Sequence, residues 1–430
     1  MKRFLRWCAA LVAMLVLAWA LAAWFDWLPL IDARQRAALE VMRAQPVGHS
    51  APQIDALPRV WLLIHRVPEQ EWPALMALPV PEMVGRLQRY PAPPVAPVIE
   101  RDNIPSLTLA ASSAEDLRKS VMAARPLLRH RDWLYQADGL TWPDAATLDD
   151  PFATPAIPDF HRLARAFRQV SALAFIDGEH AGAQAQLCAS ADFWRRLMAS
   201  ADDLFTRMVS ARMAELDVRL LAQMRAATNV ETPACAALRL PDAAELDLCP
   251  DMRTEFRLRG RGLRLLLGGD HWLERLQARL FWDPAHIEAM DAQALASHCT
   301  GTAAVQAAAT EHACGPIDWT FDPGGCFLVS SMAPGYITYA PRLRDYGSVL
   351  RLAVLAEWLR TVGDPADVST LQERFEARPP ELREHGQSLR VDAAGAWLEF
   401  TPHAPQAGTR GAPVPVRMPA PSGESAAPIH

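Results

Sequence analysis

The side chains best suited to bind a metal or to react are histidines and cysteines gathered in the C-terminal half of the chain. His298 and Cys299 are adjacent, and His312, Cys314 and Cys326 follow shortly after them. Imidazole and thiolate groups are the usual ligands of zinc. These residues contain no Cys-x-x-Cys pair, and thiols in an oxidising compartment form disulfides instead. We therefore expect neither a metal site nor a bound cofactor here.

The chain contains seven cysteines, of which Cys8 lies in an N-terminal apolar run. The other cysteines are the disulfide candidates Cys188, Cys235, Cys249, Cys299, Cys314 and Cys326. An even set after an export signal predicts more than one disulfide, although the sequence does not fix the connectivity. Short separation favours Cys235–Cys249 and one bridge among the last three cysteines. Cys188 lies at an apolar helical position, either bridged or as a buried free thiol.

Two short segments combine a histidine with carboxylates. Asp177, Glu179 and His180 surround a glycine, and residues 130–132 read His-Arg-Asp. A carboxylate near an imidazole can do acid–base chemistry. The alternative, which we favour, is that both segments are polar turns at helix ends. The catalytic residues of any enzyme activity therefore stay unknown.

Arginines cluster around Gly260 and Gly262. The cluster comprises Arg253, Arg257, Arg259, Arg261 and Arg264. It could meet anionic headgroups or an acidic partner, but a solvated helix face explains it equally simply, and we favour that reading. The two glycines lack the preceding strand and the spacing of a dinucleotide-binding turn. The chain also lacks a Gly-x-Ser-x-Gly elbow, a His-Glu-x-x-His helix and a P-loop, which removes the enzyme classes recognisable from motifs.

The N-terminus carries the clearest signal for location. Lys2, Arg3 and Arg6 precede an uncharged apolar run from Trp7 to Phe25. A helix of about 20 apolar residues spans a bilayer, and the positive flank stays in the cytoplasm. We predict a single-pass signal-anchor in a bacterial inner membrane, with the bulk of the chain in the periplasm. A cleaved signal peptide is the alternative, since residues 18–22 weakly fit a small-x-small site. A buried core helix is disfavoured.

Composition sets the class of the remaining chain. Half of the 430 residues are hydrophobic, and the formal net charge is −6. These values are typical of a globular protein and give no sign of a nucleic-acid partner. We predict a mainly α fold with small β elements near both ends of the ectodomain. The expected organisation is a stub and anchor (1–31), a juxtamembrane helix and linker (32–58), a helical domain (59–401) and a disordered Pro-rich tail (402–430).

The strongest helical pattern lies in residues 160–225, which we expect to hold the densest core. Apolar spacings of three and four predict antiparallel helices at 160–176, 181–198 and 202–224. Phe167 lies on the apolar stripe of the first helix. Arg168 lies off that stripe, so we expect it at the surface.

Weaker patterns define the other elements. Residues 60–67 predict a strand, Ser112 with Glu115 predicts a capping box that opens a helix, and residues 317–339 predict a loop with short strands. Further helices are expected at 250–267, 272–281, 284–296 and 346–362, and a β-hairpin is expected from 388–391 and 396–400.

These observations favour a non-catalytic envelope protein that binds a protein partner through helical surfaces. The expected partners are the lipid bilayer, through the N-terminal helix, and a protein of the envelope. The alternative is an envelope hydrolase whose site is not readable from motifs. A carboxylate or histidine with a shifted pKa in a deep pocket would favour the enzyme, and a broad exposed apolar groove would favour partner binding.

Overall fold

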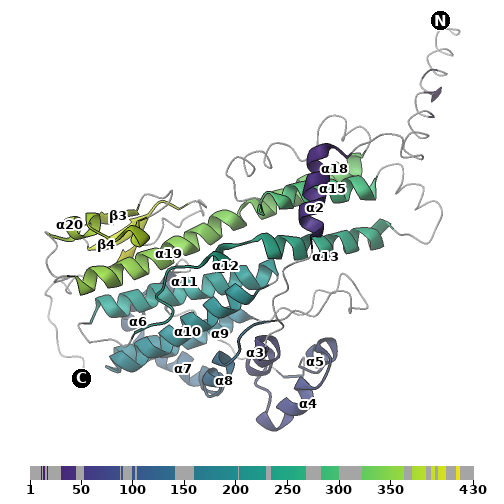
Figure 1. The fold of residues 1–430 in the computed structure, drawn as a ribbon. Coiled ribbons are helices and arrows are strands. Elements are labelled where there is room, and N and C mark those ends of the chain that lie inside the picture. Colours follow the sequence, from purple (N-terminus) through teal and green to yellow (C-terminus); the bar gives the residue numbers. More distant parts are fainter. Residues whose placement is uncertain are drawn as a thin grey trace, which may run out of the picture. The chain divides into compact units, whose positions relative to one another are not determined.

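Helices form most of the regular structure in the computed structural model of the protein (Figure 1). The structure describes residues 31–44, 53–87, 89–90, 99–101, 104–140, 159–201, 203–228, 234–267, 282–299, 322–362, 370–383, 389–392, 396–402 and 413–416, with isolated residues 11, 13, 14 and 17. The mainly α fold class is thereby confirmed. The predicted anchor and the predicted helix 272–281 lie outside the described residues, apart from those isolated positions.

The chain divides into two compact units that alternate along the sequence. Unit 1 contains Met1–Gly48, Asp144–Ala153 and Asp247–Ala340, and unit 2 contains His49–Pro143, Thr154–Leu246 and Pro341–His430. Each unit is therefore assembled from segments that are distant in sequence.

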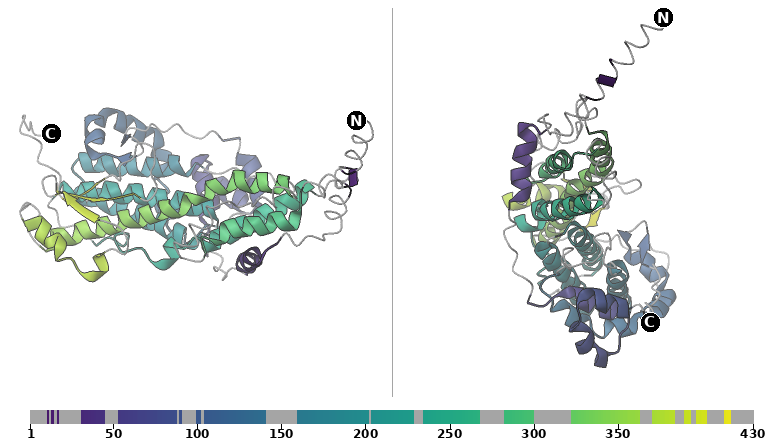
Figure 2. Two further views of the ribbon diagram at one scale, coloured as in Figure 1. Left: turned by 90° about the horizontal axis from the view of Figure 1, so that it is seen from above. Right: turned by 90° about the vertical axis from the view of Figure 1, so that its right-hand side faces the viewer.

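Three long helices form the centre of unit 2, as the apolar spacing predicts. They are α9 (Phe160–Ile176), α10 (His180–Ser200) and α11 (Leu204–Ala226), and α10 packs against both of the others (Figures 1 and 2). Gly178, with φ of 92°, makes the turn between the first two helices. The amide of Glu179 donates to the carbonyl of Ala174 (2.8 Å), and the amide of Gly178 donates to the carbonyl of Phe175 (3.1 Å). This is the Schellman arrangement that ends a helix at glycine.

Aspartate begins many of the described helices. Its carboxylate accepts a hydrogen bond from a first-turn amide in α2, α3, α9, α11, α15 and α18, and so satisfies a group that has no partner within the helix. The capping residues are Asp32, Asp55, Asp159, Asp203, Asp283 and Asp322. In α2, Gln35 also returns a side-chain contact to the amide of Asp32, which completes a capping box.

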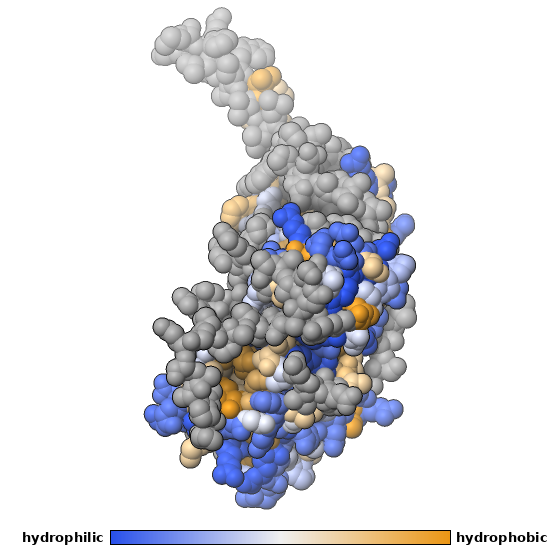
Figure 3. Space-filling model, turned by 90° about the vertical axis from the view of Figure 1, so that its left-hand side faces the viewer, coloured by the Kyte–Doolittle hydropathy of each residue, from blue (hydrophilic) through white to orange (hydrophobic). Residues whose placement is uncertain are grey.

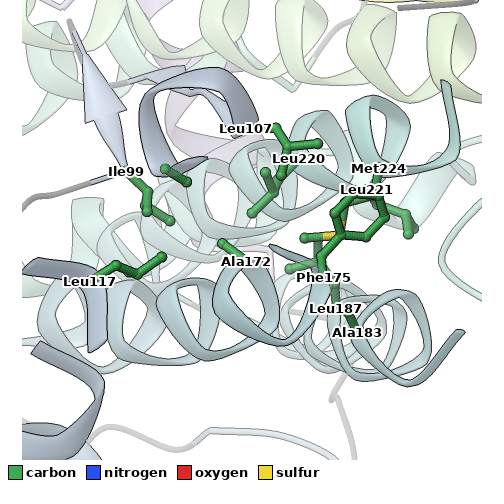
Figure 4. Close-up of a cluster of buried hydrophobic side chains, with 11 residues drawn as sticks. Ile99, Leu107, Leu117, Ala172, Phe175, Ala183, Leu187, Leu220, Leu221 and Met224 are labelled. Atoms are coloured by element: carbon green, nitrogen blue, oxygen red, sulfur yellow. The ribbon is translucent and has the colours of Figure 1, made fainter. Parts of the chain in front are cut away.

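The core of unit 2 fills the space between these helices and their neighbours. One buried cluster joins Phe175 of α9 and Leu187 of α10 to Leu221 and Met224 of α11, and it extends to Ile99 beside β1 (Glu100–Arg101) (Figure 4). Phe167, which the sequence places in the core, is 1% exposed. The prediction that residues 160–225 form the structural centre therefore agrees with the packing of unit 2.

Shorter helices surround this centre. Unit 2 also contains α3 (Ala56–Ile64), η1 (Glu69–Glu71), α4 (Trp72–Met76), α5 (Val80–Leu87), α6 (Leu107–Ser112), α7 (Ala114–Leu128), α8 (Arg131–Tyr135), α12 (Ala243–Leu246), α19 (Tyr339–Thr361, from Pro341 onward), α20 (Leu371–Glu376) and η4 (Pro380–Leu382). Strand β2 (Ile104–Pro105) pairs antiparallel with β1.

Two predictions for the first half of unit 2 are wrong. Residues 60–67 form most of α3 and the turn after it instead of a strand. Asp55 caps this helix, and the helix is buried around most of its circumference, so its continuous apolar run has no helical period. Ser112 ends α6, where its hydroxyl donates to the carbonyl of Leu109 (2.9 Å), and α7 begins at Ala114 without the predicted capping box.

The predicted C-terminal hairpin is present and carries an additional strand. β3 (Leu389–Asp392) pairs antiparallel with β4 (Trp397–Phe400), and β4 pairs with β5 (Val414–Pro415). Val414 and Val416 are buried. The prediction of a disordered tail from residue 402 is therefore wrong for residues 414–416, because these valines find a place on the sheet and against α11.

Unit 1 packs α2 (Ala33–Arg43) on helices from the other end of its sequence. These are α13 (Cys249–Leu267) and α15 (Pro284–Ala296), and α15 also packs on α18 (Pro323–Ile337). The predicted loop at 317–339 is thus a helix where it is described. Gly325 of this helix is a packing residue, because a Cβ there would lie 2.4 Å from Ile287 Cγ1. Among the residues that the structure describes, no helix is both long enough and apolar enough to cross a membrane.

Candidate functional site

A buried charge network centred on Arg168 joins four elements of unit 2. Arg168 of α9 donates to Glu100 Oε1 of β1 through Nε (3.2 Å) and Nη2 (2.7 Å), and to Asp217 Oδ1 of α11 through Nη1 (3.0 Å). Ser190 of α10 donates to Asp217 Oδ2 (2.6 Å). The side chains of Arg168 and Asp217 are 1% and 0% exposed. The prediction that Arg168 lies at the surface is wrong, because other elements cover the polar side of α9 as well.

Burial and charge act in opposition within this network. Burial raises the pKa of Asp217 to about 6, even though Arg168 and Ser190 stabilise its carboxylate. Burial also works to raise the pKa of Glu100, but Arg168 and Arg165 hold that pKa below its usual range. Arg168 therefore lies between one carboxylate that is readily ionised and one that keeps a proton in mildly acidic solution.

Tyr135 and His161 lie close to the same charges. Burial raises the pKa of Tyr135, whose ring packs against Phe167 with the ring centroids 5.5 Å apart. Burial and the charge of Arg168 lower the pKa of His161. The network thus continues outward from Asp217, through Glu100, to the partly exposed Arg165, whose Nη2 lies 3.6 Å from Glu100 Oε2.

A second buried arginine holds a loop of unit 2 in place. Arg195 of α10 donates from Nη2 to both carboxylate oxygens of Glu245 (2.8 and 2.7 Å), and both side chains are 0% exposed. Its Nη1 also donates to the carbonyls of Ala237 (2.5 Å) and Arg239 (2.8 Å). We call this set, Arg195 with Glu245 and the backbone of residues 237–240, the Arg195 clamp. It satisfies the donors of a buried guanidinium and fixes the segment that follows α11.

The disulfides differ from the pairing that short separation favours. Cys188 bonds to Cys235, and Cys249 bonds to Cys299, across 47 and 50 residues respectively. The predicted Cys235–Cys249 bridge is therefore wrong, and so is a free thiol at Cys188. Tertiary packing brings distant cysteines together, and sequence separation does not report it.

The remaining cysteines are only partly described. Cys326 is also disulfide-bonded, and its Sγ lies 3.9 Å from Met290 Sδ. Cys8, His312 and Cys314 lie outside the described residues. Among the residues that the structure describes, no group of histidines, cysteines and carboxylates could hold a metal ion.

The main titratable cluster of unit 1 surrounds Arg259 of α13. Its Nη1 lies 2.8 Å from Asp291 Oδ1 of α15, and its guanidinium carbon lies 4.9 Å from the ring centroid of Tyr336 on α18. Tyr336 donates weakly to Glu255 Oε2 (3.4 Å), one turn before Arg259 on α13. We call these residues, Glu255, Arg259, Asp291 and Tyr336, the Arg259 cluster. It joins three helices of unit 1.

Both carboxyl groups of the Arg259 cluster have raised pKa values. Burial raises the pKa of Asp291 to about 6 against the opposing charge of Arg259, and burial raises the pKa of Glu255 also. Burial together with Glu255 raises the pKa of Tyr336 to about 12. Among the residues that the structure describes, these two carboxyl groups with raised pKa values beside one arginine are a candidate for proton exchange.

The acid–base groups that the sequence brings to attention contact side chains from other segments or from the preceding helix. Asp177 pairs with Arg118 (2.7 Å), and the ring of His180 packs against Phe175 with the centroids 4.6 Å apart. His130 instead contacts Glu69, with Nε2 3.1 Å from Oε1, and stacks edge-on against Trp72. The favoured reading of both segments as polar turns at helix ends agrees with these contacts.

The arginines of α13 that the sequence groups together make different contacts. Arg253 donates to the carbonyl of Val41 in α2 (3.0 Å), and Arg259 belongs to the cluster named after it. Arg257 is exposed. Since Arg253 and Arg259 contact other helices, the described arginines of this group do not form a single solvated face.

The sequence does not predict one buried pair of side chains in unit 1. His286 Nδ1 lies 3.1 Å from Asp322 Oδ2, and both side chains are 0% exposed. The same Asp322 carboxylate caps α18 by accepting from the amide of Gly325 (2.8 Å). The only signal available in the sequence is the Asp-Pro pair at 322–323, which is typical of a helix start.

Taken together, the described charged groups with the deepest burial join elements that are distant in sequence. Burying a charge costs several kcal/mol unless partners and hydrogen bonds compensate it, and here arginines meet carboxylates and carbonyls at hydrogen-bonding distance. Within the described part of the chain, the Arg259 cluster combines a buried carboxyl group of raised pKa, Asp291, with the partly exposed Glu255, whose pKa is also raised. Comparison of the chain with family models, with curated proteins and with solved structures finds no match in any of the three.

Proposed function

We propose that this protein is a membrane-anchored periplasmic protein of the bacterial inner membrane, which binds an envelope protein through its helical surfaces without catalysing a reaction. The observation that carries the location is the pair of disulfides, Cys188–Cys235 and Cys249–Cys299. Disulfides persist in oxidising compartments and are rare in a reducing cytosol. The apolar run behind three basic residues supplies the anchor, with the N-terminus in the cytoplasm.

The use of the buried charges supports a binding role. The Arg168 network and the Arg195 clamp spend their hydrogen-bonding capacity on holding helices and a loop in one arrangement. A rigid frame lowers the entropic cost of binding a partner. On the face shown in Figure 3, small hydrophobic patches are visible among hydrophilic residues.

Location is tested on the full chain in spheroplasts and in isolated membranes. Protease added to spheroplasts should digest the ectodomain, and alkaline carbonate should leave the protein in the membrane fraction. Release of a soluble form that begins near residues 19–24 would contradict the anchor and leave export standing. Complete protection from protease in spheroplasts would contradict export itself.

Partner binding is tested by purifying the detergent-solubilised protein and identifying co-purifying proteins by mass spectrometry. Met122 of α7 is 74% exposed, so Met122→Glu changes the surface without touching the core. A panel of such surface variants should include one that loses a co-purifying protein while its disulfides stay formed. If no envelope protein is enriched over an unrelated membrane bait, the binding role is wrong.

The second candidate is an envelope hydrolase that uses the Arg259 cluster. The observation in its favour is Asp291, whose pKa of about 6 suits a general acid near neutral pH. A panel of chromogenic esters, phosphates, glycosides and peptides tests this candidate. Activity that disappears in Asp291→Asn, with the fold retained, would establish the enzyme and displace the non-catalytic proposal.

A further inference from the structure

Helix α2 fixes how far unit 1 can lie from the membrane. The predicted anchor ends at Phe25, and Asp32 caps α2. An extended chain spans at most about 3.6 Å per residue, so this connection reaches no more than roughly 25 Å. If the anchor of the proposed function is correct, the first turn of α2 lies within that distance of the bilayer surface.

Helix α2 is firmly part of unit 1 and is not a free tether. Met42 and Leu39 of α2 are buried, and α2 packs on α15 and α13. Arg43 donates to Glu288 of α15 (3.0 Å), and Arg253 of α13 donates to the carbonyl of Val41 (3.0 Å). The helices of unit 1 are therefore held beside the membrane together with α2.

Unit 1 exposes apolar side chains that its own packing does not cover. Phe327 of α18 is 67% exposed, although its neighbour Cys326 is 0% exposed and disulfide-bonded. Asp322 caps the same end of α18. Leu258 of α13 is 39% exposed and stands beside the exposed Arg257. Phe327 is thus held outward by a helix end that is fixed at two points.

We infer that unit 1 rests on the lipid bilayer, with Phe327 in the headgroup region and Arg257 near anionic phosphates. Phenylalanine is among the side chains that enter the boundary between headgroups and acyl chains, and arginine is attracted to an anionic surface. The short connection to the anchor favours the bilayer as the partner, because it keeps α2 close to the membrane surface. This inference rests on the proposed anchor, and it adds a second point of contact.

The test replaces Phe327 with the photoreactive p-benzoylphenylalanine in the full chain, in membranes that contain anionic lipid. Met122 of unit 2 receives the same probe as a control, since it is 74% exposed and no short connection ties it to the anchor. We expect lipid adducts at position 327 at least tenfold above those at position 122, because the probe would lie among lipids at position 327 and in water at position 122. Retention of the Cys188–Cys235 and Cys249–Cys299 disulfides, seen by peptide mapping without reduction, verifies the fold.

The outcomes separate this inference from the proposed function. If carbonate extracts the protein, the anchor fails and the inference fails with it. If the protein is retained but position 327 gives no more lipid adduct than position 122, the anchor stands and the membrane contact is wrong. Adducts of position 327 to a second copy or to another protein would also overturn the membrane contact.

Discussion

Arg168 lies on the polar side of a helix that has neighbours on both sides. Helix α9 packs against α7, α10 and α11, so a residue off its apolar stripe is still enclosed. The guanidinium is compensated there by Glu100 and Asp217. A buried charge that loses its partner is costly, so the network makes a sharp prediction about stability.

Replacing Arg168 should therefore destabilise unit 2 strongly. Arg168→Ala leaves Asp217 buried without its cation and should lower the free energy of unfolding by about 3–5 kcal/mol at pH 7. Arg162→Ala is the matched control on the same helix, because its pair with Asp159 is partly exposed (29% and 46%). An exposed pair contributes at most about 1 kcal/mol. Equal denaturant midpoints for the two variants would show that the network contributes nothing.

Asp217 should make stability depend on pH in an unusual direction. Its folded pKa of about 6 exceeds the unfolded value, so the folded state holds the proton more tightly. This residue is therefore least favourable to folding above pH 6, and its contribution improves as pH falls toward 4. Asp217→Asn removes that change.

The measurement for Asp217 is urea unfolding of both proteins at a series of pH values. The stability of the wild type relative to Asp217→Asn should rise by up to about 3 kcal/mol between pH 7 and pH 4. Glu100 and Glu215 have lowered pKa values and lose stability in acid, but both proteins share that loss. A difference that stays constant with pH would contradict the assignment.

At the scale of elements, the disulfides connect segments that local pattern cannot relate. Cys188 lies within α10, and Cys235 lies in the segment that the Arg195 clamp holds. Peptide mapping without reduction should find Cys188 joined to Cys235 and Cys249 joined to Cys299. Replacing Cys188 and Cys235 by serine should cost about 4 kcal/mol in the chain-entropy model. Peptides that join Cys235 to Cys249 would contradict the structure.

The C-terminal strand β5 predicts that two truncations of the tail differ in their effect on stability. Arg360 of α19 donates to the carbonyls of Pro415 (2.9 Å) and Val416 (2.9 Å), which fixes this strand to the rest of unit 2. Deleting residues 406–430 should lower stability by at least about 2 kcal/mol, since two buried valines are lost. Deleting residues 417–430 should leave thermal unfolding unchanged. Identical melting of both truncations would show that β5 does not stabilise unit 2.

The elements that the sequence predicts well are those with a clear period and a clear end. Helices α9, α10 and α11 have apolar spacings of three and four, and Gly178 ends the first of them. Helix α3 fails because burial on most sides removes the period. Helix α18 fails because Gly325 serves close packing against Ile287, although glycine alone reads as a turn. The Arg168 network forms where four elements meet in the folded protein, and the sequence pattern of each element does not reveal that contact.

At the scale of the whole molecule, the alternation of the two units is the main feature that sequence reading misses. The predicted map runs as consecutive segments, whereas unit 1 combines α2 with helices that follow the main part of unit 2. The exact packing partner of an amphipathic helix is set by tertiary contacts, and its own residues state only that one face is apolar.

This alternation predicts that α2 stabilises α15. Met42 is 1% exposed, and its truncation to alanine should cost about 2–5 kcal/mol within unit 1. Hydrogen exchange in peptides from α15 should therefore accelerate in Met42→Ala. Glu40→Ala, at an exposed position on the same helix, should leave exchange unchanged. If Met42→Ala leaves α15 as protected as in the wild type, α2 does not belong to unit 1.

The divided construction of unit 1 also sets an order of events in biosynthesis. Helix α2 is made early, whereas α15 follows about 240 residues later, so at roughly 5–20 residues per second the wait lasts on the order of 10–50 s. Throughout that interval Leu39 and Met42 have no partner to cover them. A newly made chain thus exposes an apolar helix to chaperones early in synthesis, and α2 is among the last of the described helices to reach its final position.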